Sequence, residues 1–185
     1  MSTDYQSPVK LGYEEFVLFP NDGNRHEIID GKHYMNPAPS TGHQSASKHL
    51  QYQLYQKIEL ADLGKVFDAP IDVQLSDHDI VEPDLIVLRE SSSAKITPSR
   101  IVGPPELVIE ILSPSTKRND ETLKRRLYEQ SGVLEYWLVD IDQQNVTQMV
   151  LENGIYHQRP EKLSTSISLA ILPEIEIDLT LVWRS

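Results

Sequence analysis

Two carboxylates interrupt apolar stretches in the middle of the chain, in settings that packing alone explains poorly. Asp84 follows Pro83 within the apolar segment 81–88, and Glu110 lies near the end of the apolar segment 106–112. A buried carboxylate requires a partner. If the two segments are neighbouring strands, both side chains can bind one divalent cation, and Mg²⁺ prefers such oxygen ligands. A metal held there stabilises charge during displacement at a phosphodiester. The pattern therefore indicates a metal site that acts on phosphate.

Each carboxylate also has a purely structural interpretation. Asp84 can cap a turn after Pro83, and Glu110 can pair with an arginine. For either residue alone the structural role is favoured. The pair, followed by a basic helix, favours the site.

That basic stretch is a local exception on an acidic chain. Residues 117–126 contain five basic and two acidic residues, whereas the whole chain has a net charge of −11. The net charge argues against a nucleic-acid-binding surface over the whole protein. A local basic face remains compatible with a phosphate-bearing substrate.

Lys124 lies in a helix expected over 120–131, with Leu123 and Leu127 on its buried row. It shares an i, i+4 row with Asp120 and Tyr128. Its ammonium can reach the cleft as a point charge for phosphate or to orient water. The alternative is an Asp120–Lys124 pair on a solvated face.

Two further polar residues are candidates. Glu27 is a third carboxylate on an apolar segment, where it completes the metal site or acts as a cross-strand charge in a hairpin around Asp30-Gly31. His43 lies in the first turn of a helix expected over 42–61, where it supports the metal-binding carboxylates, donates to substrate phosphate or is simply exposed. The lack of cysteine and of a second histidine at metal spacing argues against a zinc site.

Length and composition indicate one globular domain over 1–185, with a core over about 11–182. No apolar run approaches the ~20 residues that span a membrane. The absence of cysteine and of a signal-peptide core favours the cytoplasm.

Strands separated by single helices predict an α/β or α+β fold with a mixed sheet. Thr41 and Gln44 have the spacing of a capping box at the start of the long helix, and 91–102 is expected to be a polar surface loop. The expected elements are a helix over 11–18, a hairpin over 26–35, a helix over 42–61, strands over 65–70, 71–75, 81–88 and 106–112, a helix over 120–131, a strand over 134–140, a hairpin over 146–159 and an alternating strand over 174–179.

Five blocks in this order resemble the Uma2 family, described as a domain of unknown function or a putative restriction endonuclease. They are residues 26–31, 37–43, 81–85, 106–116 and 132–140. The resemblance covers nearly the whole chain. It implies the restriction-endonuclease-like fold of the PD-(D/E)xK superfamily, a mixed β-sheet flanked by helices.

The resemblance also implies roles. Asp84 takes the place of the motif's Asp, and Glu110 that of its second acidic residue. The motif's lysine should fall two residues later, where Leu112 stands, so Lys124 would be its migrated replacement. Glu27 would match an additional acidic position near the start of the core.

The function implied is Mg²⁺-dependent, or Mn²⁺-dependent, endonucleolytic cleavage of DNA, with a duplex as the expected substrate. Asp84 and Glu110, with the Ile111 carbonyl, would hold the metal, while Lys124 would position water or bind the scissile phosphate. Backbone phosphates would meet Lys95, Arg100 and the substrate-binding candidates His43, Ser113, Lys117, Arg118 and Arg125.

A rival hypothesis from another class is a catalytically silent module that retains the fold and binds nucleic acid or protein. Leu112 at the lysine position and the net charge of −11 both favour it. A homodimer is compatible with either hypothesis, since members of the superfamily often dimerise to reach both strands.

Overall fold

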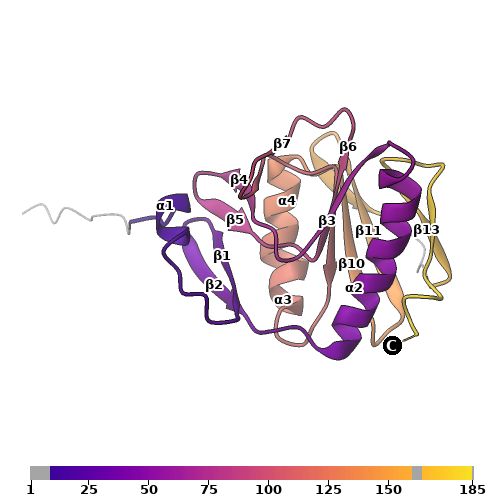
Figure 1. Ribbon diagram of the computed structural model, residues 1–185, viewed down its shortest axis with the longest axis horizontal. Helices are drawn as coiled ribbons and strands as arrows, with labels where there is room; N and C mark the ends of the chain where they lie inside the picture. The colour runs from indigo at the N-terminus through magenta and orange to yellow at the C-terminus, as the bar shows by residue number, and fades with distance from the viewer. Residues whose placement is uncertain (1–8, 160–163, 185) are drawn as a thin grey trace, which may run out of the picture.

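The computed structural model describes residues 9–159 and 164–184, so residues 1–8, 160–163 and 185 of the predicted domain lie outside it. Two larger sheets and a small one make up the strands of this part of the chain (Figure 1). We call them the central sheet, in the order β12-β11-β10-β9-β6-β3, and the lateral sheet, in the order β2-β1-β5-β4-β8-β7. The third pairs β13 with β14.

The central sheet is mixed, as the sequence predicts. β9 and β10 run parallel, and each of its other neighbouring pairs is antiparallel. Buried residues dominate the middle strands, because layers cover both faces of the sheet. The strands are β3 (Gly64–Asp68), β6 (Leu85–Arg89), β9 (Leu107–Ile111), β10 (Glu135–Asp140), β11 (Asn145–Glu152) and β12 (Ile155–Gln158).

The lateral sheet was not predicted as a separate sheet. Its first hairpin turns at Asp30 and Gly31, whose φ values of 51° and 72° are those of the tight turn that the Asp-Gly pair favours. The expected loop 91–102 contributes two short strands to it. The strands are β1 (Arg25–Ile29), β2 (Lys32–Asn36), β4 (Val73–Ser76), β5 (Asp79–Val81), β7 (Lys95–Ile96) and β8 (Ile101–Val102).

The strand predicted over 81–88 is in fact two strands in different sheets. β5 ends at Val81 in the lateral sheet, and β6 begins at Leu85 in the central sheet. Pro83 lies between them and has no N–H to give to a ladder. This crossing places Asp84 where the two sheets meet.

One face of the central sheet is covered by α2 (Thr41–Leu54), η1 (Tyr55–Glu59) and the C-terminal strands β13 (Ser166–Ser168) and β14 (Glu176–Asp178). Ala46, Leu50, Leu54 and Ile58 recur every four residues along α2 and η1 and are buried against it. The predicted cap at Thr41 is wrong by one residue. Ser40 is the cap, and its Oγ accepts a hydrogen bond of 3.2 Å from the His43 N–H.

The other face is covered by α3 (Lys117–Asn119), η2 (Asp120–Lys124) and α4 (Arg125–Ser131), which lie between the two sheets (Figure 1). Gly132 ends α4 with a φ of 85°, directly after the predicted helix end at residue 131. The predicted inward position of Leu123 is wrong, because that residue is 37% exposed and Lys124 only 3%. η2 is a π-helical turn, which takes one more residue than an α-turn and so shifts the inward-facing row.

The N-terminal helix α1 (Tyr13–Phe16) is shorter than the predicted 11–18. It is fastened to the lateral sheet by Arg100, whose guanidinium lies 3.7 Å from the Tyr13 ring centroid. The same guanidinium donates a 2.8 Å hydrogen bond to Gln74. Arg100 therefore holds the fold together at this point.

In the described part of the chain, every helix is too short or too polar to cross a membrane.

A buried carboxylate on β10 joins the C-terminal segment to the central sheet. Glu135 is fully buried and accepts hydrogen bonds from the Trp137 indole and the Gln148 amide, both at 2.6 Å. It also accepts the Ile171 N–H at 3.0 Å. Without the carboxylate, the Trp137 indole and the Ile171 N–H would lose this partner, while the Gln148 amide would keep only its 3.0 Å hydrogen bond to the Ser168 carbonyl.

We therefore expect Glu135→Ala to lower the free energy of unfolding by about 3 kcal/mol, since buried donors without partners cost about 1–3 kcal/mol each. Urea denaturation followed by circular dichroism measures it. Glu152→Ala is the matched control, because Glu152 is exposed and its 3.6 Å pair with Arg159 contributes little. Equal effects of the two substitutions would contradict the structural role of Glu135.

Candidate active site

Asp84 immediately precedes β6 and lies next to the end of β9. Leu85 pairs with Ile109 in the antiparallel ladder, so one step further along the register brings Asp84 beside Glu110. Asp84 is 4% exposed and its Oδ2 accepts the Ile111 N–H at 2.8 Å. The prediction that these two carboxylates come from neighbouring strands is confirmed.

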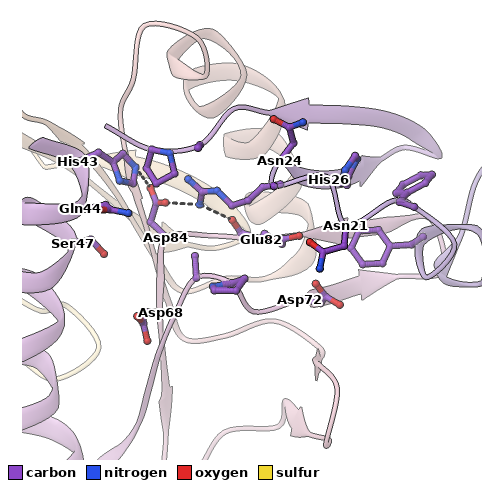
Figure 2. A pocket seen from close by; sticks show the side chains of 18 of the residues that line it. Asn21, Asn24, His26, His43, Gln44, Ser47, Asp68, Asp72, Glu82 and Asp84 are labelled. Carbon is purple, nitrogen blue, oxygen red and sulfur yellow. Dashed lines mark hydrogen bonds and ion pairs between the residues drawn. The ribbon is translucent and has the colours of Figure 1, made fainter. Parts of the chain in front are cut away.

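Two side chains from other layers hold Asp84. Arg25, at the start of β1, donates through Nη1 to Oδ1 at 2.6 Å, and His43 of α2 lies with Nε2 3.0 Å from Oδ2 (Figure 2). Burial opposes ionisation of Asp84, but the hydrogen bond from His43 and the charge of Arg25 outweigh it and lower its pKa. Asp84 is therefore a carboxylate with both oxygens already engaged.

Lys124 is buried among three carboxylates that come from three elements. Its Nζ lies 2.7 Å from Glu27 Oε1 on β1, 3.0 Å from Glu110 Oε1 on β9 and 3.6 Å from Asp120 Oδ1 on η2. Burial would lower the pKa of Lys124, but these three charges raise it well above its ordinary value. The ammonium is therefore charged and held in place. We call Lys124 and the three carboxylates around it, those of Glu27, Glu110 and Asp120, the lysine cluster.

Neutral donors complete the lysine cluster. The Tyr128 hydroxyl donates to Glu110 Oε1 at 2.7 Å. The Asn36 amide donates to Glu27 Oε2 at 2.8 Å, and the Glu82 N–H donates to Glu27 Oε1 at 3.0 Å. Glu27 thus has partners on both oxygens, whereas each described contact of Glu110 uses Oε1.

Negative charge is in excess at this site. The four buried carboxylates Glu27, Asp84, Glu110 and Asp120 face only two obligatory cations, Arg25 and Lys124. Burial, together with the charges of Asp120 and Asp84, raises the pKa of Glu110 to about 8 against the opposing charge of Lys124. Burial likewise raises the pKa of Asp120. Arg25 and Lys124 therefore neutralise only part of the negative charge that the four carboxylates would carry if all of them were ionised.

A cavity of about 200 Å³, here called the small cavity, opens onto these groups. Its lining includes Asp84, Glu110, Asp120 and Lys124, together with the N-terminus of α2 and the turn 113–116. Ser113 is among the lining residues, with its Oγ 3.0 Å from the hydroxyls of Ser115 and Thr116.

The structure brings together only some of the predicted site residues. Asp84, Glu110, Lys124 and Glu27 share ion pairs or neighbouring strands, and His43, Ile111 and Ser113 adjoin them on the small cavity. Lys117, Arg118 and Arg125 are not among the residues that line this cavity. Lys117 instead pairs with Asp140 at 2.9 Å on the surface.

Sequence reasoning missed Arg25, Asn36 and Tyr128 as members of the site. Arg25 and Asn36 pair with each other in the β1–β2 register, which brings both to the end of the hairpin nearest Asp84. Tyr128 follows Lys124 by four residues on one helix face, and that spacing was a usable signal for it. For Arg25 and Asn36 no local signal existed, because the contacts depend on how the lateral sheet docks.

The oxygen donors of the site fit a hard divalent cation, although their side chains are not arranged as a complete metal-coordination site. Among the described residues, no group of three or more His, Asp or Glu side chains converges on a point where a metal could bind. The Ile111 N–H, rather than its carbonyl, contacts Asp84. Asp120 Oδ1, however, is buried without a hydrogen-bond partner in the described residues. Oxygen donors with an excess of negative charge are what Mg²⁺ or Mn²⁺ binds.

The family model for Uma2, described as a putative restriction endonuclease, matches residues 13–181. The chain belongs to the Uma2 family. This confirms the resemblance seen in the sequence blocks.

Two further proteins are similar to this Uma2 chain. An uncharacterised protein of Synechocystis sp., slr1290, is 26% identical over 154 residues, which are 82% of this chain and 76% of that protein. The crystal structure of a putative nuclease belonging to DUF820 from Anabaena variabilis has a TM-score of 0.76 at 20% identity, over 94% of this chain and 97% of that chain. This likeness confirms the predicted fold.

The lysine cluster makes a double-substitution experiment informative. We expect Lys124→Met to lower the free energy of unfolding by about 3–5 kcal/mol, because it leaves buried carboxylates without their cation. Adding Glu27→Gln should recover part of that loss, since it removes one of the unpaired charges. Urea denaturation of both single variants and the double variant measures the coupling.

Lys117→Met is the matched control, because its ion pair lies at the surface and its loss should cost less than about 1 kcal/mol. If Glu27→Gln added its own destabilisation to that of Lys124→Met without any recovery, Lys124 would not be compensating Glu27.

Proposed function

We propose that this Uma2 protein is a Mg²⁺-dependent endonuclease that hydrolyses phosphodiester bonds in DNA, with Mn²⁺ able to replace Mg²⁺. The single observation that supports this best is the pairing of β6 with β9, which puts Asp84 beside Glu110 at a cavity that Lys124 also lines. Family membership supports a nuclease in general terms.

Asp84 and Glu110, with the backbone at Ile111, are the residues that would hold the metal. When bound, the metal would act as a Lewis acid on the phosphate and lower the pKa of a bound water. For it to bind, Asp84 must share an oxygen that Arg25 or His43 now contacts, and Glu110 can offer Oε2.

The remaining residues act on charge and position. Tyr128 fixes Glu110 through a 2.7 Å hydrogen bond, and Glu27 fixes the Lys124 ammonium at 2.7 Å. That ammonium is the fixed positive charge nearest to Glu110, so it can stabilise charge on the scissile phosphate or orient the attacking water. Its placement supports the hypothesis that Lys124 replaces the lysine missing at Leu112.

His43 and Ser113 adjoin the small cavity and are proposed to contact the substrate phosphate there. Lys117, Arg118 and Arg125 are proposed to meet backbone phosphates farther away, as is Lys95. Arg100 is already engaged with Tyr13 and Gln74. The affinity for a duplex that is bound through such charges falls steeply as the salt concentration rises. A homodimer that reaches both strands is part of this proposal.

We expect Asp84→Asn and Glu110→Gln each to reduce Mg²⁺-dependent cleavage of plasmid DNA by at least about 100-fold, because each removes a charged ligand without changing side-chain size. Gel assays over a range of enzyme concentrations measure this. Circular dichroism and thermal melting show whether each variant is folded.

Asp142→Asn is the control, because Asp142 is an exposed carboxylate in the turn between β10 and β11. It should cleave at the wild-type rate. Metal-dependent cleavage that persists in both Asp84→Asn and Glu110→Gln would contradict the proposed site.

A second candidate is a catalytically silent module that binds nucleic acid or protein. It is favoured by the engagement of both Asp84 oxygens and by the lack of a ready three-ligand group among the described residues. Under this hypothesis Arg25 and Lys124 substitute for the metal as permanent counter-charges.

Calorimetric titration distinguishes the two candidates. For a nuclease, Mg²⁺ and Mn²⁺ should bind the wild type and not the Asp84→Asn, Glu110→Gln double variant. Titrations are repeated with a DNA duplex present, since substrate phosphate often completes a Mg²⁺ site. Wild-type protein that binds neither ion under either condition would favour the silent module.

A further inference from the structure

A second, larger cleft adjoins the site and shares Arg25, His43 and Asp84 with the small cavity. It has a volume of about 900 Å³ and is lined by the segment 16–26, by α2, by residues 68–72 and by Glu82. Figure 2 shows Asp84 between its two walls, with Gln44 and Ser47 of α2 on one side and Asn21, Asn24 and Asp72 on the other. We call it the large cleft, and its volume lies in the range of small-molecule sites.

The charges of the large cleft are unfavourable for phosphate. Its lining includes four carboxylates, Asp68, Asp72, Glu82 and Asp84, against two obligatory cations, Arg25 and Lys48. Arg25 is already bound to Asp84 at 2.6 Å. A phosphate group inside the large cleft would therefore meet repulsion, whereas an uncharged group with hydrogen-bonding edges would not.

Most of the side-chain amides that line the large cleft have no hydrogen-bond partner among the described residues. Four amide side chains line it: Asn21, Asn24, Gln44 and Gln51. Among the described residues, the side-chain amides of Asn21, Gln44 and Gln51 have no hydrogen-bond partner, whereas Asn24 contacts Asp22 both through its backbone N–H at 2.9 Å and through its side chain. Amides and carboxylates are the groups that recognise the amino, imino and carbonyl groups on base edges.

Flat apolar surfaces accompany these polar groups. Phe16 and Phe19 line the large cleft, with their rings edge-to-face at 5.8 Å, and Pro39 and Pro70 line it as well. Aromatic rings beside hydrogen-bonding side chains are how proteins hold an unstacked base. The combination differs from a groove that tracks a phosphate backbone, which would be basic.

We propose that the large cleft binds the base of an unpaired, extrahelical nucleotide, whose neighbouring phosphate lies at Asp84 and Glu110. This inference rests on the proposed function, because it assigns the substrate's base to the same site. A base inside a duplex is stacked and cannot enter such a cleft, so the nucleotide must be extruded or already unpaired. The preferred DNA is accordingly a duplex that carries a bulge, mismatch or single-stranded end.

The test compares three labelled duplexes of otherwise identical sequence. One has a single-base bulge, one has an abasic residue in the bulge, and one is fully paired. Fluorescence anisotropy at low salt with EDTA present measures wild-type affinity without cleavage. We expect about tenfold tighter binding to the base-containing bulge than to the abasic bulge, the contribution of one held base.

The variant Asn21→Ala, Asn24→Ala should reduce that preference to less than about threefold, because it removes amides from one wall of the large cleft. Gln56→Ala, Gln130→Ala is the matched control, since both residues are exposed and neither lines the large cleft. The control should keep the tenfold preference. Thermal melting of both double variants verifies that they are folded.

Equal wild-type affinity for the three duplexes would overturn the inference. If the same protein then cleaves DNA in Mg²⁺ and needs Asp84 and Glu110, the proposed function stands and only the large-cleft assignment falls. If it neither binds nor cleaves any of them, both fall. A preference that survives in the Asn21, Asn24 variant would also overturn the assignment.

Discussion

The structure of this Uma2 protein depends on one buried ammonium. Lys124 of η2 meets Glu27 of the lateral sheet and Glu110 of the central sheet within 3.0 Å, and so it joins three layers at one point. Without that charge, carboxylates from separate elements would be buried together and would repel one another. The π-helical turn at Asp120–Lys124 allows this contact, because its extra residue turns the Lys124 side chain inward.

Two buried glutamates on neighbouring strands show how structural and functional carboxylates differ. Glu135 of β10 has neutral donors on both oxygens and lies away from the small cavity. Glu110 of β9 has its described partners on one oxygen, lines the small cavity and has a pKa raised to about 8 by burial. The first is satisfied by the fold, whereas the second keeps a capacity for another cation.

Arg25 connects the site to the large cleft. The Arg25 guanidinium lies 2.6 Å from the Asp84 carboxylate and neutralises its charge. Arg25 also lines both cavities. Any ligand or metal that competes for Asp84 must therefore move or share this contact. The two cavities meet at one carboxylate, which makes Asp84 the position where metal, phosphate and base would be brought together.

The sequence by itself determined the family, the mixed sheet and the candidates Asp84, Glu110, Lys124 and Glu27, because buried charges on apolar segments are visible in one dimension. It also determined the Asp30-Gly31 turn, where local backbone preference is sufficient. It did not reveal that 81–88 divides between two sheets, or that Leu123 faces outward, since a sheet crossing and a π-turn are decided by what packs around them. Arg25 and Asn36 are in the site only because the lateral sheet docks there, and such long-range contacts leave no local pattern.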